Sequence, residues 1–299
     1  MQDDSPRGFA FAGGAFLIWG MLPFYFNALS HVPTIEVVAH RVIWAVPVAM
    51  AVLIWLGRTD ALRSAIATPR MLGMACVTAA LISLNWGAYV WLVQSGQAME
   101  AALAYYINPI FNVFLGYMLL GEKLTRRQWA AVALALAAVV VLTVEARSLP
   151  IGALVVIFSW GSYAYFKRAL PIGPNQGFAL EALILLPIAL LVLGWIYLQG
   201  DLFTAAASGP DWVLLVGCGL ITAAPLMLYA NGAKALRLST IAIAGYSIPT
   251  MIFLISVFAF REPFEGARLV AFPMIWAAMA LYIWEVLRKK GLPPEHRAV

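Results

Sequence analysis

The sequence predicts an all-α integral membrane protein with ten transmembrane helices, and three observations lead to this class. Only 11% of the 299 residues are charged and the mean hydropathy is +0.88, whereas about a quarter of the residues in a soluble domain are charged. Apolar blocks of roughly 20 residues, the length that crosses the hydrocarbon core of a bilayer, recur along nearly the whole chain. The connections between them are too short to fold as separate domains, so any function must lie among the helices.

The apolar blocks, and the charged or Gly- and Pro-containing breaks between them, place the ten helices. The first block is interpreted as a retained helix rather than a signal peptide, because its apolar stretch exceeds the roughly 7–15 residues of a signal sequence. The expected ranges are 8–29, 34–56, 71–94, 98–120, 127–145, 149–168, 176–198, 211–232, 239–260 and 267–287.

The distribution of the positive charges agrees with this helix count. With ten helices, fifteen Lys and Arg residues fall on the side that holds both termini, and three, Arg147, Arg261 and Arg268, fall on the other side. Arg41 lies inside a predicted helix. Cytoplasmic loops carry an excess of Lys and Arg, so the distribution predicts that both termini are cytoplasmic.

The two halves of the chain resemble each other at an offset near 140 residues. Each half holds five predicted helices, and an odd number makes the second half enter the membrane from the opposite side. The sequence therefore predicts two inverted five-helix repeats, residues 1–146 and 147–299, around a central cavity. The matching residues are Tyr106, Pro109 and Glu122 with Tyr246, Pro249 and Glu262, Trp19–Gly20 with Trp160–Gly161, and Tyr89 with Tyr229.

Three ionisable side chains fall well inside predicted helices, away from the helix ends, where each costs about 2.5–3.5 kcal/mol on insertion scales and is a functional candidate by default. His40 and Glu181 match each other in the repeat. Each of these two side chains could face the cavity or bond a neighbouring helix. Of these alternatives, we predict for His40 that it lines the cavity. Arg41 is expected to bind substrate, to reach the membrane interface, or to pair with Glu36 or Glu100.

Neutral polar and aromatic side chains complete the candidate site. An asparagine amide can bind substrate or another helix, and an indole face can hold an apolar group or an ammonium group. Pro109 and Pro249 are expected to interrupt their helices beside the cavity. The predicted substrate-binding set is Trp19, His40, Arg41, Asn85, Trp86, Tyr89, Tyr106, Asn108, Trp160, Tyr163, Glu181 and Tyr246.

Three segments carry a resemblance to a known family over essentially the whole chain. They are EVVAHRVIW at 36–44, EAALAYYINPIFNVFLGYMLLGE at 100–122 and LRLSTIAIAGYSIPT at 236–250. With them the chain resembles the drug/metabolite transporter superfamily, in its EamA-domain branch, and within it the RarD-like proteins and YddG-type amino-acid exporters. The resemblance implies two EamA repeats in the bacterial inner membrane, with the fifth and tenth helices peripheral. It also implies efflux of amino acids or similar metabolites.

The leading hypothesis is a secondary transporter that exports amino acids, mainly apolar and aromatic ones, by alternating access. Arg41, Asn85 or Asn108 would hold the substrate carboxylate, and a Trp face, a freed carbonyl or Glu181 would hold its ammonium group. The alternative within transport is a proton-coupled drug or nucleotide-sugar-type antiporter. A structural role would leave the polar groups inside the membrane unexplained.

Other classes of function lack the residues they need. The chain has three His and no metal-spaced cluster, which disfavours an enzyme. It has no phosphate-binding Gly-rich loop, and its basic residues form no nucleic-acid-sized patch. We therefore expect no cofactor, metal or nucleic acid. The expected partners are the lipid bilayer and a small molecule; the oligomeric state stays open, and a monomer is compatible with the sequence.

Overall fold

The computed structural model describes residues 5–121, 123–147, 149–236 and 238–291, and every regular element among them is a helix. The elements follow the predicted ranges to within a few residues, so the all-α membrane class is confirmed. They are α1 (Pro6–Ala28), α2 (Thr34–Trp55), α3 (Asp60–Ala67), α4 (Pro69–Gln94), α5 (Ala98–Leu120), α6 (Arg126–Ala146), α7 (Ile151–Ala169), α8 (Pro174–Gln199), η1 (Phe203–Ala206), α9 (Gly209–Ala235), α10 (Leu238–Ala244), α11 (Ser247–Leu254), η2 (Ile255–Ala259) and α12 (Arg268–Gly291).

Eight of these helices are long and apolar enough to cross a membrane, namely α1, α2, α4, α5, α6, α8, α9 and α12. Two shorter apolar helices, 151–167 and 247–259, occupy the remaining predicted positions. The sequence did not predict α3, which has only eight residues and begins at a charged one. Its Leu62 and Ala65 are buried, so it packs as a short connector rather than as a membrane span.

The two proline-containing helices of the repeat differ from each other. Helix α5 continues through Pro109, whereas the matching range divides into α10 and α11 at Gly245 and Tyr246, just before Pro249. A proline ring clashes with the carbonyl of the residue four positions earlier, which is Tyr105 in α5 and Gly245 in the second half. Glycine is a poor helix former, so the second helix breaks at that point.

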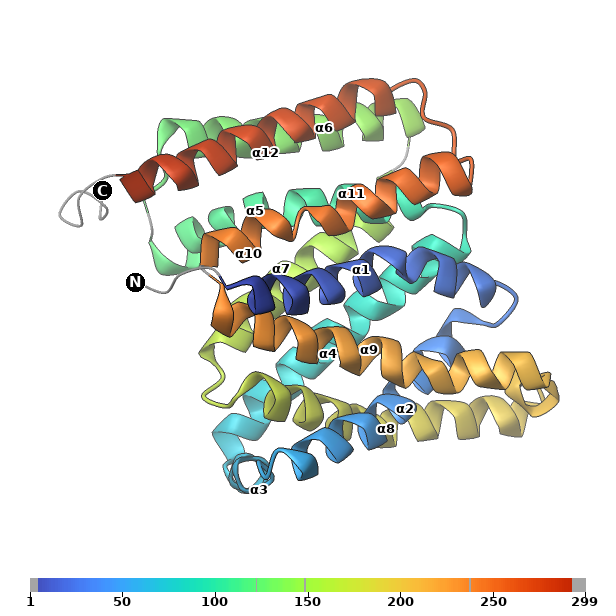
Figure 1. Ribbon diagram of the computed structural model, residues 1–299. Coiled ribbons are helices and arrows are strands. Elements are labelled where there is room, and N and C mark those ends of the chain that lie inside the picture. The colour runs from blue at the N-terminus through green and yellow to red at the C-terminus, as the bar shows by residue number, and fades with distance from the viewer. Residues whose placement is uncertain (1–4, 122, 148, 237, 292–299) are drawn as a thin grey trace.

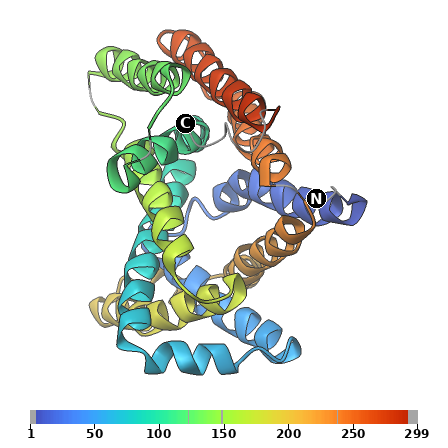
Figure 2. The same cartoon turned by 90° about the vertical axis from the view of Figure 1, so that its left-hand side faces the viewer.

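The helices run roughly side by side, and the described ends of the chain lie at the same end of the bundle (Figure 1). We call this end of the bundle, where α1 begins and α12 ends, the terminal end. The opposite end holds the turns at 29–33 and 95–97. Helices α6 and α12 pack against each other at one edge, away from α2, α3 and α8 (Figure 2). They match the fifth and tenth predicted helices, which the family resemblance placed at the periphery.

Packing between the helices repeats between the halves. Helix α1 packs on α9 as α7 packs on α4, and α1 packs on α11 as α7 packs on α5. Close approaches repeat too: Gly20 of α1 faces Met251, and Gly161 of α7 faces Phe111, and neither glycine has room for a Cβ atom. Gly161 follows Gly20 by 141 residues, and Met251 follows Phe111 by 140 residues. The two contacts therefore match each other in the repeat.

Candidate substrate cavity

A cavity of about 1290 Å³ lies between the helices of the two halves. Small-molecule sites usually have about 300–1000 Å³, so this space has room for a metabolite together with water. Its lining includes Ala169, Pro174 and Asn175 at the α7–α8 connection, and the cavity therefore extends to the terminal end. Pro109 and Pro249 both line it, as the sequence predicted for the two proline-containing helices.

The structure brings together nine of the twelve residues that the sequence proposed for substrate binding. These nine come from both halves of the chain. They are Trp19, Arg41, Asn85, Trp86, Tyr89, Asn108, Trp160, Tyr163 and Tyr246.

Arg41 is the one charged side chain of helix α2 that lines the cavity, and it is only 4% exposed. Its Nε donates a hydrogen bond to Oγ1 of Thr222 at 2.8 Å. Its guanidinium lies 4.5 Å from the ring centroid of Trp86 and 5.3 Å from that of Phe26. Among the described residues, Nη1 has no hydrogen-bond partner and no carboxylate forms an ion pair with Arg41. Arg41 is therefore a planar cation in the cavity wall that lacks a counter-ion among the described residues, and its Nη1 atom is itself buried.

The asparagines of the cavity differ in their partners. Asn85 donates to the backbone oxygen of Val156 at 3.3 Å and to Oγ of Ser159 at 3.2 Å, so it joins α4 to α7. Asn108 is buried, and neither of its amide atoms has a partner among the described residues. The alternative of interhelical bonding thus fits Asn85, whereas the buried amide of Asn108 has no such partner among the described residues.

Aromatic rings form the apolar part of the wall. Tyr105 links two predicted site residues, with ring centroids 5.8 Å from Tyr89 and 6.2 Å from Trp160. Trp19 of the first half contacts Tyr229 of the second half, with ring centroids 5.5 Å apart. These edge and tilted contacts hold large apolar faces in fixed positions beside the cavity. The sequence-based set omitted Tyr105 and Tyr229, although the repeat signal pairs Tyr229 with Tyr89.

A second cation in the lining, Lys167, is neutralised. Its Nζ lies 2.6 Å from Oε1 of Glu181, and Tyr163 donates to Oε2 of the same carboxylate at 3.2 Å. Glu181 is 1% exposed and lies behind Lys167 rather than in the cavity lining. Lys167 is one of the fifteen positive residues counted on the side of the termini, and it lies in the last turn of its predicted helix. Among the described residues, no three His, Cys, Asp or Glu side chains gather in a metal-binding group.

Two other predicted residues also lie outside the lining. Nδ1 of His40 accepts a hydrogen bond from the indole of Trp44 at 3.2 Å, and its ring meets that of Trp212 edge to face. The prediction that His40 lines the cavity is not met, because neighbouring residues point about 100° apart around a helix and Arg41 takes the inward direction. The hydroxyl of Tyr106 bonds Oγ1 of Thr250 at 2.8 Å.

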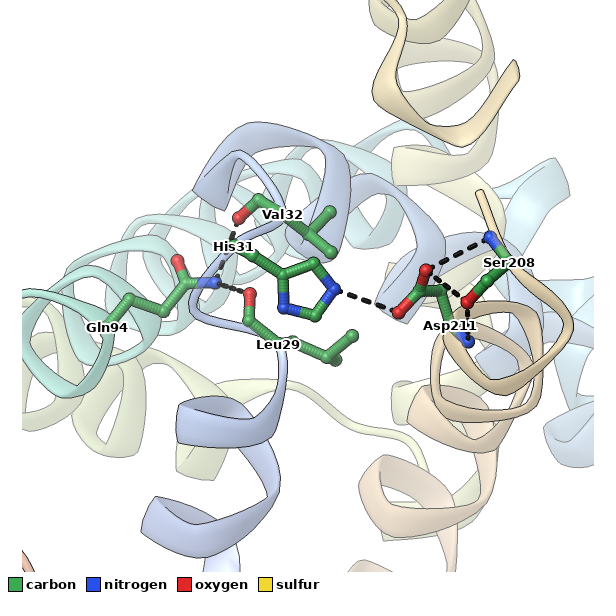
Figure 3. Close-up of polar contacts among 6 residues, drawn as sticks. All are labelled: Leu29, His31, Val32, Gln94, Ser208 and Asp211. Atoms are coloured by element: carbon green, nitrogen blue, oxygen red, sulfur yellow. Dashed lines mark hydrogen bonds and ion pairs between the residues drawn. The ribbon is translucent and has the colours of Figure 1, made fainter. Parts of the chain in front are cut away.

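Polar contacts close the opposite end of the bundle (Figure 3). Nε2 of Gln94 donates to the backbone oxygens of Leu29 at 2.6 Å and Val32 at 3.0 Å, which ties α4 to the turn after α1. His31 in that turn lies 2.8 Å from Oδ1 of Asp211 at the start of α9. The contact joins the two halves at the surface.

Two buried carboxylates join the halves at the same end. Glu36 of α2 accepts hydrogen bonds from both the backbone and hydroxyl groups of Thr204 and from the backbone N–H of Phe203. Glu262 accepts from the backbone N–H groups of Ala98 and Met99 at 2.8 and 3.0 Å.

Burial raises the pKa of the Glu262 carboxyl, while the hydrogen bonds from Met99 and Ala98 oppose this rise. The carboxyl lies in the connection between η2 and α12 and is 7% exposed. Glu122, its predicted match in the repeat, lies outside the described residues. Whether the first half holds an equivalent contact therefore stays a prediction.

Comparison with known proteins adds a family match. The model of the EamA-like transporter family matches residues 6–144. The chain is 36% identical to "Uncharacterized transporter YojE" of Bacillus subtilis, with 98% of this chain and 99% of that protein covered. It is 34% identical to "Protein RarD" of Escherichia coli K12, with 94% and 95% covered, and 34% identical to "Protein RarD" of Streptomyces exfoliatus, with 96% and 91% covered.

A solved crystal structure supports the fold. One of its chains superimposes with a TM-score of 0.60, covering 94% of this chain and 98% of that one. The two sequences are 20% identical. At this level of identity the likeness concerns the arrangement of the helices alone.

Proposed function

Because this chain belongs to the EamA-like transporter family, among its RarD-type members, we propose that it exports small carboxylate-bearing metabolites, apolar and aromatic amino acids among them. The chain is a multi-pass membrane transporter, so a small molecule and the lipid bilayer are its partners. The substrate class and the direction of transport are what the proposal adds.

The observation that carries the proposal is the charge of Arg41, which lines the cavity without a counter-ion among the described residues. A buried ion without a counter-ion costs several kcal/mol, whereas a carboxylate beside it offsets this cost. Arginine presents its donors in a fork that matches the two oxygens of a carboxylate, and hydrogen bonds between ions are roughly twice as strong as neutral ones. A substrate carboxylate beside the Arg41 guanidinium would therefore supply the missing counter-ion.

The rest of the cavity suits an apolar or aromatic substrate body. Rings from both halves line it, and Asn108 keeps an unpaired amide for a second polar group. The volume exceeds that of any single amino acid, so a range of side chains would be accepted with water filling the remainder.

We propose that residues 1–146 and 147–299 are inverted repeats that exchange roles during alternating access. The repeated packing of Gly20 and Gly161 supports this relation, and inverted repeats around a midplane site are a common transporter design. We also propose that the terminal end faces the cytoplasm, on the basis of the fifteen to three distribution of positive charges. The conformation described here would then be the one that loads substrate from the cytoplasm.

Transport by the purified protein in proteoliposomes tests the proposal. We expect uptake of labelled phenylalanine or leucine, and we expect alanine in place of Trp19, Tyr89, Trp160 or Tyr163 to reduce it several-fold without loss of protein from the membrane. The matched control is Trp195→Ala, because that side chain is 66% exposed on the outer surface of the bundle. Full transport with all four cavity residues replaced would place the site elsewhere.

The orientation has its own test. A reporter enzyme that is active only in the periplasm, fused after residue 299, should give no signal if the C-terminus is cytoplasmic. A strong signal would reverse the proposed direction of loading while leaving the cavity assignment intact.

A further inference from the structure

The charges that line the cavity are unbalanced. Arg41 and Lys167 are its charged lining residues, and no Asp or Glu belongs to the described lining. Lys167 is already paired with Glu181 at 2.6 Å. Arg41 has no such partner among the residues that the structure describes, so one net positive charge remains to be matched by whatever occupies the cavity.

An amino acid would match this charge only in part. Its ammonium group is attached to the carbon that bears the carboxylate, so a carboxylate bound to Arg41 brings the ammonium group close to the guanidinium. The guanidinium itself already lies over two aromatic rings, those of Trp86 and Phe26. An ammonium group placed there would meet a like charge rather than a free ring face.

The carboxylates nearby are also occupied. Glu36 precedes Arg41 by five residues on α2, but it accepts three hydrogen bonds from Phe203 and Thr204. Glu181 accepts from both Lys167 and Tyr163. Neither carboxylate belongs to the cavity lining, so the wall offers an ammonium group no free counter-ion.

We propose that this carrier prefers net anions, namely apolar or aromatic monocarboxylates without a free ammonium group, over the zwitterionic amino acids of the same shape. 2-Oxo acids and N-acyl amino acids belong to this chemical class. The inference rests on the proposed function, because it assumes that the cavity around Arg41 is the transport site.

Three compounds with the same phenyl group separate the contributions of the two charges. 3-Phenylpropionate carries the carboxylate alone, phenylalanine carries both groups, and 2-phenylethylamine carries the ammonium group alone. We would measure their binding to the purified full-length protein in detergent by isothermal titration calorimetry, because binding is not affected by passive leakage across a membrane. We expect 3-phenylpropionate to bind at least tenfold more tightly than phenylalanine, and 2-phenylethylamine not to bind detectably.

Variants of Arg41 connect the preference to this residue. Arg41→Gln should weaken the binding of 3-phenylpropionate at least tenfold. Arg41→Lys keeps the charge but loses the planar fork, so its affinity should lie between those of the wild type and Arg41→Gln. The control is Arg7→Gln, because Arg7 is exposed and lies outside the cavity lining, and it should bind as the wild type does. Thermal unfolding of each variant shows whether it is folded, and the wild-type comparison of the three compounds stands without any variant.

The outcomes separate this inference from the proposed function. Phenylalanine binding as tightly as 3-phenylpropionate, or tight binding of 2-phenylethylamine, would overturn the anion preference and leave a carboxylate or amine transporter to be defined. Wild-type affinity for 3-phenylpropionate in folded Arg41→Gln would overturn the role of Arg41. If no compound binds and proteoliposomes transport neither amino acids nor 3-phenylpropionate, the proposed function itself fails.

Discussion

The two ends of the helix bundle are joined in different ways. At the opposite end, Gln94, Glu36 and Glu262 reach across to backbone groups of other elements and hold the helices together. At the terminal end, the cavity extends between the helices as far as Ala169 and Asn175. A carrier that works by alternating access must open one end of the bundle while it closes the other. The contacts at the opposite end are therefore the ones that would have to open.

The contacts between the halves at the closed end are reciprocal. Glu36 of the first half binds η1 of the second, and Glu262 of the second half binds the first turn of α5 in the first. Each carboxylate accepts backbone N–H groups that a helix start leaves unpaired. Opening this end would expose those N–H groups to water, which can replace the lost partners and keep the free-energy difference between the two conformations small.

The largest expected effect concerns access to a thiol at each end. With Cys76 and Cys218 replaced by Ser, Asn175→Cys at the terminal end should react with a maleimide in detergent about tenfold faster or more than Val32→Cys, since reaction at a buried site requires local opening. Val32 is 2% exposed, whereas Asn175 lines the mouth of the cavity. Equal rates would mean that the two ends are equally accessible, which would contradict this comparison.

The second effect concerns Glu36. Glu36→Ala leaves the N–H groups of Phe203 and Thr204 without their acceptor, and each unpaired buried group costs about 1–3 kcal/mol. We expect a clear fall in thermal stability in detergent, and a smaller fall for Glu36→Gln, which keeps one acceptor oxygen. His31→Gln is the control, because its contact with Asp211 lies at the surface and exposed ion pairs contribute little. A His31 variant as unstable as Glu36→Ala would contradict this ranking.

The smallest effect is a pH dependence at Glu262. Burial raises the pKa of this carboxyl in the folded state, so its contribution to stability is present below its unfolded pKa of about 4.3 and is lost as the pH rises through the folded value. We expect the wild type to lose stability relative to Glu262→Gln over this pH window. The measurement is the difference between their unfolding temperatures from pH 4 to 7, where the other titrating groups cancel. A difference that does not change with pH, or grows in favour of the wild type, would contradict the raised pKa.

The site was predicted in part because its residue types are unusual within apolar helices. Arg41, Asn108 and Trp160 were found in this way, since polar and large aromatic groups inside a span need a partner or a cavity. The same criterion also selected His40, which turned out to contact Trp44 and Trp212 instead. Composition identifies a residue that cannot face lipid, but it does not give the direction in which the side chain points.

The sequence alone determined the membrane class, the positions of ten apolar helices and the match between the halves, because each of these depends on local composition or on spacing along the chain. Tertiary structure decided which face of α2 looks inward, that Glu181 neutralises Lys167, and that the cavity extends to the terminal end. These features depend on contacts between residues far apart in sequence, such as Arg41 and Thr222. No local pattern records such contacts, because they arise only when the helices pack.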